Sequence, residues 1–127
     1  MLTAAETAAV NAVDGDGAVA LLSALVRAKS VWPADMEDEV AQVVARYLDA
    51  AGIKATLDYV QPGRPNVLAQ LGRGDGPTLL WNAHLDTVSP GNLAAWTSDP
   101  FGAELSEVLR CTRVLAVSAL RACGAAR

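Results

Sequence analysis

Hydrophobic residues recur at helical spacing in two stretches of the first half of the chain. Between residues 18 and 29, Ala, Leu and Val side chains fall three or four positions apart, and Pro33 then breaks the helix. The range 40–51 carries a continuous apolar stripe along one helical face, and Gly52 suits the position just after it. The stripe consists of Val40, Val43, Val44, Tyr47, Leu48 and Ala51. The pattern therefore predicts two amphipathic helices.

The residues around these helices carry further signals. The Ala-rich residues 1–13 predict a short helix with little patterning. The segment 14–17 then interrupts the chain, and either of its aspartates can cap the helix that follows. Four carboxylates lie at the start of the second amphipathic helix, where the helix dipole favours them: Asp35, Glu37, Asp38 and Glu39. We expect them to face solvent as a charged helix start rather than to form a metal site.

After Gly52 the period of the hydrophobic pattern changes to two. Alternating apolar and polar residues over 53–59 predict a half-buried strand, and a turn at 62–65 leads to a second strand over 66–71. Residues 78–83 are almost continuously apolar, which is typical of a strand buried on both faces. Helices followed by strands predict an α/β fold class.

Charge and composition exclude several classes of protein. The net charge of −4 argues against a nucleic-acid partner or an anionic membrane surface, and no apolar run approaches the length of a membrane-spanning helix. The first residues lack a basic region and include Glu6, so we expect no signal peptide and a cytoplasmic location. The two cysteines are then expected to be reduced thiols, and their spacing gives no zinc signature.

The charge is unevenly distributed along the chain. Residues 1–105 hold six Lys and Arg against thirteen Asp and Glu, a net charge of −7. Residues 106–127 hold four Arg against one Glu, a net charge of +3, together with both cysteines. This asymmetry indicates two segments of different character.

The single histidine of the chain, His84, follows the predicted buried strand and is separated by one residue from Asp86. Alternation along an extended chain places both side chains on the same side, at the end of a strand where α/β sheets bind ligands. A neutral imidazole can bind Zn²⁺ there, and a nearby carboxylate can orient the ring. A polar pair in a turn is the alternative interpretation of this spacing.

Three segments together resemble a known family: Asn-Val-Leu-Ala at 66–69, Leu-Leu-Trp-Asn-Ala-His-Leu-Asp-Thr-Val at 79–88, and Trp-Thr-Ser-Asp-Pro-Phe-Gly at 96–102. Their order and spacing are similar to those of the dizinc aminoacylase/carboxypeptidase family over residues 18–105. That family of metallopeptidases and deacylases includes acetylornithine deacetylase, succinyl-diaminopimelate desuccinylase, aminoacylase and glutamate carboxypeptidase. The resemblance implies the N-terminal part of a zinc-peptidase-like catalytic domain, in which helices precede a mixed sheet.

The resemblance also implies a chemistry. His84 would be a ligand to one of two zinc ions, which cobalt can replace, and Asp86 would be the catalytic-site residue that orients its imidazole. In the family the metal ions activate a bridging water that attacks an amide carbonyl, with a glutamate as general base. The implied substrate is a small molecule, an N-acyl amino acid or a short peptide with a free carboxylate.

The chain departs from the family pattern after residue 105. The next sequence motif of the family, which resembles Gly-Arg-Gly-x-x-Asp, is not found in residues 106–127, where the sign of the net charge changes. We therefore divide the chain into a partial metallohydrolase domain, 1–105, and a divergent tail, 106–127, which a frameshift or an aberrant terminus explains. A genuine helix over 105–115 is the alternative for the tail. Asp99, Glu104 and Glu107 are the carboxylates left as makeshift ligands, although their spacing does not argue for that role.

These observations favour a truncated, inactive fragment of a zinc-dependent amide hydrolase. One alternative is a non-catalytic α/β binding or interaction domain, with the acidic helix over 35–51 as its partner face. Another is a fragment that folds poorly, because a buried strand needs neighbours on both edges. Neither the acyl group, the amino acid nor the oligomeric state follows from the sequence.

Overall fold

The computed structural model describes residues 2–72, 74 and 76–103 of the chain. These residues form three α-helices, one two-stranded sheet and a short 3₁₀ helix, which confirms the α/β fold class. They belong to two compact units. The first holds residues 2–20, 74 and 76–82, and the second holds residues 21–72 and 83–103. The tail 106–127, with both interpretations of it, an aberrant terminus or a helix, lies outside the described residues.

The first unit begins with α1, Ala4–Asn11. Thr3 and Glu6 form a capping box, in which each side chain bonds to the other residue's backbone N–H. The following helix, α2, spans Gly15–Ala28 and continues into the second unit. As predicted from the sequence, Asp14 caps α2, because its carboxylate accepts a hydrogen bond from the backbone N–H of Gly17 at 3.0 Å.

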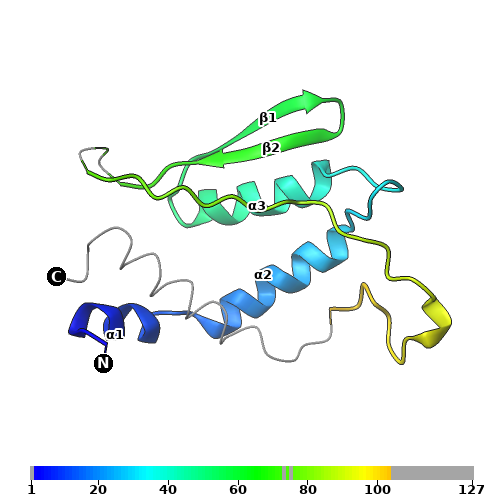
Figure 1. Ribbon diagram of the computed structural model, residues 1–127, viewed down its shortest axis with the longest axis horizontal. Helices are drawn as coiled ribbons and strands as arrows, with labels where there is room; N and C mark the ends of the chain where they lie inside the picture. Colours follow the sequence, from blue (N-terminus) through cyan, green and yellow to red (C-terminus); the bar gives the residue numbers. More distant parts are fainter. Residues whose placement is uncertain (1, 73, 75, 104–127) are drawn as a thin grey trace. The chain divides into compact units, whose positions relative to one another are not determined.

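In the second unit, the helix α3, Asp38–Ala50, packs against a β-hairpin (Figure 1). The hairpin consists of β1, Ala55–Gln61, and β2, Arg64–Ala69, which pair antiparallel with Leu57 opposite Val67. Gly52 follows α3 with a φ of +76°, the left-handed conformation expected of a helix-terminating glycine. The sequence thus predicted both strands, and their observed bounds lie two residues from the predicted ones.

The prediction of a buried strand over 78–83 is wrong. These residues form no ladder with the described part of the chain, and Leu80 and Trp81 are 82% and 65% exposed. An apolar run becomes a buried strand only where neighbouring strands satisfy its backbone groups, and the described residues supply no such neighbour. The sheet is accordingly a two-stranded antiparallel one, and the parallel pairing of a mixed sheet is limited to an isolated bridge between Val31 and Thr87.

Few side chains are buried in the described residues. The buried hydrophobic residues are Ala28, Val31, Val40 and Ala41, and no large side chain is fully enclosed. The first two follow one another around the end of α2, and the other two begin α3. The most enclosed part of the second unit therefore surrounds the connection between α2 and α3, which is where the His84 segment attaches.

Candidate functional site

The backbone around His84 is fixed to the residues that follow α2. The N–H of Thr87 donates to the carbonyl of Ser30, and the N–H of Trp32 donates to the carbonyl of Thr87, both at 2.9 Å. These two bonds form the parallel bridge between Val31 and Thr87. The extended segment 84–87, which belongs to no sheet, is therefore anchored by its backbone at the Thr87 end.

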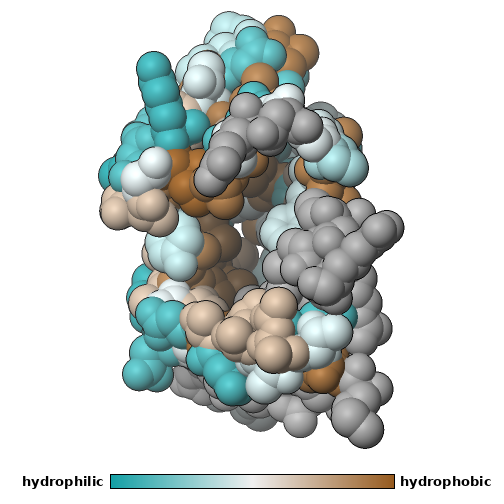
Figure 2. Space-filling model, turned by 90° about the vertical axis from the view of Figure 1, so that its left-hand side faces the viewer, coloured by the Kyte–Doolittle hydropathy of each residue, from teal (hydrophilic) through white to brown (hydrophobic). Residues whose placement is uncertain are grey.

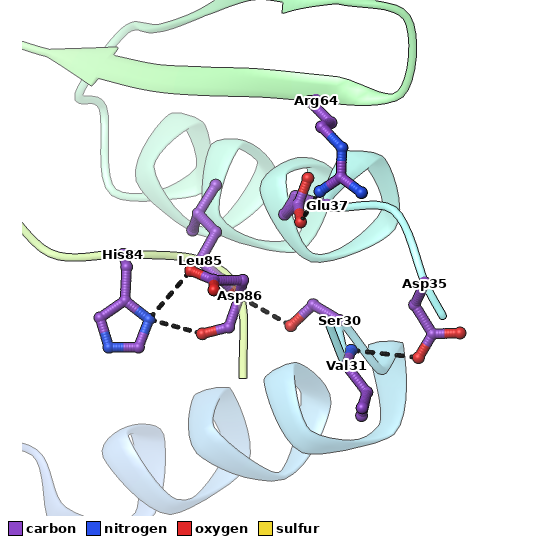
Figure 3. Close-up of polar contacts among 8 residues, drawn as sticks. All are labelled: Ser30, Val31, Asp35, Glu37, Arg64, His84, Leu85 and Asp86. Atoms are coloured by element: carbon purple, nitrogen blue, oxygen red, sulfur yellow. Dashed lines mark hydrogen bonds and ion pairs between the residues drawn. The ribbon is translucent and has the colours of Figure 1, made fainter. Parts of the chain in front are cut away.

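His84 and Asp86 lie side by side on this extended segment (Figure 3). The Nδ1 atom of His84 is 3.2 Å from Oδ1 of Asp86 and also contacts the backbone carbonyl of Asp86. Leu85, between them, projects to the other side, as alternation along a strand requires. The prediction that the two side chains share one side of the chain is confirmed, and their roles remain predictions.

This arrangement determines which nitrogen of His84 carries the proton. Both groups that face Nδ1 are oxygen acceptors, so the neutral imidazole bonds to them only with its proton on Nδ1. The lone pair then lies on Nε2, the nitrogen that points away from Asp86. The His84 side chain is 81% exposed, so Nε2 is open to a ligand. A neutral imidazole with its second nitrogen bonded to a carboxylate is the form in which histidine binds metals.

The described residues supply only part of a metal centre. They contain no group of three His, Cys, Asp or Glu side chains close enough to hold one ion. Asp99 is used locally, because its carboxylate accepts a hydrogen bond from the backbone N–H of Phe101 at 2.9 Å. Glu104 and Glu107 lie outside the described residues. In this part of the chain, His84 can therefore serve as one ligand of a zinc ion, without the further ligands of a complete site.

A second polar cluster, which sequence analysis missed, joins α3 to the hairpin. Glu37 is 8% exposed and pairs with Arg64 (Figure 3). The guanidinium of Arg64 lies over the ring of Trp32, 4.5 Å from its centre. Asp38 accepts a hydrogen bond from the hydroxyl of Tyr59. The expectation that the acidic residues before α3 face solvent is therefore wrong for Glu37. The sequence does show an acidic residue before α3 and a basic residue at the start of β2, but it does not tell which carboxylate pairs with Arg64.

The hydrogen bond between Asp38 and Tyr59 changes the acidity of the phenol. Because the carboxylate accepts from the neutral hydroxyl, ionisation of Tyr59 breaks this bond and places two negative charges together, which raises the pKa of Tyr59 above its ordinary value of 10.0. Asp35 has a different role, because its carboxylate accepts a hydrogen bond from the backbone N–H of Val31 at 3.1 Å. The acidic run thus stabilises the loop and the hairpin contact.

In the described part of the chain, no single helix is long and apolar enough to cross a membrane, although α1 and α2 meet the length and composition criteria as a bent pair. No family model matches the sequence. No solved structure matches it either.

Curated proteins do match the sequence. Succinyl-diaminopimelate desuccinylase of Methylobacterium nodulans is 41% identical over 93 residues, 70% of this chain and 23% of the relative. The enzyme of the same name from Cereibacter sphaeroides is 42% identical over 90 residues, with the same coverage of both chains. That of Xanthobacter autotrophicus is 34% identical over 92 residues, 70% of this chain and 24% of the relative.

The chain spans about a quarter of the length of these curated relatives. Within that span the identity is well above what unrelated sequences of this length share. The chain therefore belongs, over the part that the relatives match, to the dizinc aminoacylase family that contains the succinyl-diaminopimelate desuccinylases.

Proposed function

We propose that this chain provides the first metal ligand of a zinc-dependent hydrolase that cleaves the amide bond of N-acyl amino acids, with succinyl as the favoured acyl group. The observation that carries the proposal is the His84–Asp86 pair, in which Asp86 occupies Nδ1 and leaves Nε2 exposed. The names of the relatives support the choice of a succinylated substrate over an acetylated one or a short peptide.

Each residue of the pair has a defined task in this proposal. Asp86 holds the proton on Nδ1. Its negative charge stabilises positive charge on the ring, and this makes the lone pair of Nε2 a stronger metal ligand. His84 then binds the ion through Nε2. When bound, zinc, or cobalt in its place, polarises the amide carbonyl and activates a water molecule as nucleophile.

We further propose that the 127-residue chain alone does not turn over substrate. Catalytic zinc takes about three protein ligands and keeps a position for water, and the family uses two such ions. The described residues contribute His84 and no group of three candidate ligands. For an active centre to form, the remaining ligands and the general base must come from outside the described residues.

The single histidine makes the proposal directly testable, because every imidazole signal in the NMR spectrum belongs to His84. We expect added Zn²⁺ to shift the Nε2 resonance of ¹⁵N-histidine-labelled protein, and His84→Ala to abolish this binding. Asp86→Asn removes the charge behind Nδ1 and is expected to weaken binding by roughly 10- to 100-fold. Asp99→Asn is the matched control and should leave the affinity unchanged.

A zinc titration in which the His84 resonances do not move would contradict the metal-ligand role. Hydrolysis is measured separately, with N-succinyl and N-acetyl amino acids and the 127-residue chain. We expect no zinc-dependent product. Turnover that disappears in His84→Ala would support the ligand role and contradict the proposed inactivity of the chain alone.

A further inference from the structure

Ser30 contacts the backbone on both sides of Asp86. Its hydroxyl donates a hydrogen bond to the carbonyl of Leu85 at 2.7 Å (Figure 3). Its own carbonyl accepts a hydrogen bond from the N–H of Thr87 at 2.9 Å. Ser30 is 3% exposed, and it follows α2 immediately after Lys29. One buried residue therefore anchors the residue before Asp86 and the residue after it.

The two hydrogen bonds of Ser30 fix different parts of the segment. The bridge at Thr87 fixes the chain after Asp86, and its bonds come from backbone groups that any residue at position 30 provides. The anchor at Leu85 lies between His84 and Asp86 and depends on the serine hydroxyl alone. Loss of the hydroxyl would leave the peptide unit between Leu85 and Asp86 free to rotate. That rotation moves His84 relative to the carboxylate that faces its Nδ1 atom.

We propose that Ser30 is a positioning residue for the metal ligand: its hydroxyl, through the carbonyl of Leu85, holds Nδ1 of His84 against Asp86. Its catalytic importance rests on the proposed function, whereas the positioning itself is a property of the chain without metal. A serine 55 positions away from the carbonyl that it binds thus sets the tautomer of the only histidine.

The test reads the tautomer from the ¹⁵N chemical shifts of His84 in the full 127-residue chain, without metal, at a fixed pH at which the imidazole is neutral. We expect the Nδ1–H form to dominate in the wild type. Ser30→Ala should lower the ratio of the Nδ1–H to the Nε2–H form by roughly two- to ten-fold, the factor that corresponds to one hydrogen bond. Ser30→Thr keeps the donor and should restore the ratio.

The matched control is Ser23→Ala, because Ser23 is also buried, at 8% exposure, but lies within α2 rather than beside Leu85. It should leave the ratio unchanged. A folded Ser30→Ala protein with the wild-type ratio would overturn the proposal, as would an equal change in Ser23→Ala. If Ser30→Ala does not fold, Ser30→Cys retains the side-chain shape with a weaker donor, and a wild-type ratio in that folded variant would also overturn it.

This experiment separates the inference from the proposed function. Suppose that the tautomer ratio changes in Ser30→Ala and that the His84 resonances of the wild type do not respond to Zn²⁺. This result supports the positioning role and contradicts the metal role. If Ser30→Ala binds zinc and keeps the wild-type tautomer ratio, the result supports the metal role of His84 and contradicts the positioning role of Ser30.

Discussion

At the scale of single residues, the carboxylates of this chain differ in what they contact rather than in how they are spaced. Asp86 faces an imidazole, Asp38 accepts from a phenol, and Asp14 caps a helix. The sequence pattern around each of the three is that of an ordinary helix or extended segment and does not reveal its partner. Their partners, and not their positions, decide whether they affect acidity, helix formation or a candidate metal ligand.

The contact between Asp38 and Tyr59 gives a prediction for alkaline pH. Tyr47→Phe leaves Tyr59 as the only tyrosine of the chain, so the absorbance change on phenolate formation reports Tyr59 alone. We expect its titration midpoint above 10.0, because the hydrogen bond to Asp38 raises the pKa. Asp38→Asn in this background should lower the midpoint. A midpoint that does not respond to Asp38→Asn would contradict the contact.

The sign of the stability effect follows from the direction of the shift. The pKa of Tyr59 is higher in the folded chain than in the unfolded one, so the bond contributes its full stability below the ordinary phenol pKa of 10.0. That contribution is lost as the pH rises through the folded-state pKa. Tyr59→Phe should therefore destabilise the chain at neutral pH but make little difference once the phenol is ionised.

At the scale of elements, the pair Glu37 and Arg64 strengthens the contact of α3 with the hairpin. Their side chains are 10% and 17% exposed, so removal of one partner leaves the other charge poorly solvated. Arg64 also covers the ring of Trp32, and this adds an attraction between cation and aromatic face. The ion pair thus joins three segments: the loop after α2, the start of α3 and the start of β2.

We expect Arg64→Ala to lower the free energy of unfolding by about 2 kcal/mol, because it leaves the carboxylate of Glu37 buried without its partner. Urea unfolding followed by far-UV circular dichroism measures this change. Arg46→Ala removes an exposed arginine of α3 and should cost less than about 0.5 kcal/mol. Equal effects of the two substitutions would show that the pair contributes no more than a surface charge.

Local patterns in the sequence predicted the helices and the hairpin, because spacing, caps and turn residues act within a few positions. The observed end of α2 at Ala28 lies one residue before the predicted one, and Lys29 adopts the left-handed φ of +48° there, a conformation that helix ends more often assign to glycine. The fate of 78–83 and the bond between Ser30 and Leu85 depend on residues far apart in the chain. Alternation alone placed His84 beside Asp86, and it left the anchor at Ser30 unseen.

At the scale of the whole chain, the described residues leave much apolar surface exposed. Figure 2 shows hydrophobic side chains open to solvent among polar ones on the face that it presents. Large side chains that are more than half exposed include Val60, Leu68, Leu71, Leu80, Trp81 and Val88. Isolated exposed residues are ordinary in folded proteins, but this number beside the four buried hydrophobic residues of the described part indicates that this part alone has low stability.

Two substitutions distinguish exposed from buried apolar residues. Leu80 is 82% exposed, so Leu80→Gln should reduce binding of a hydrophobic dye and leave the free energy of unfolding within about 0.5 kcal/mol. Val40 is 4% exposed, so Val40→Ala should lower that free energy by about 1–2 kcal/mol. A large loss of stability in Leu80→Gln would show that this residue is packed in solution.

The bridge between Val31 and Thr87 closes a loop that contains all of α3 and the hairpin. The ends of this loop lose more chain entropy on meeting than the ends of the tight turn between β1 and β2. We therefore expect the local contacts to form first and the segment that carries His84 to join them in a later step of folding. The environment of the single histidine consequently reports whether the second unit has finished folding, since a chain that stops at the helix and hairpin has not yet brought Leu85 to Ser30.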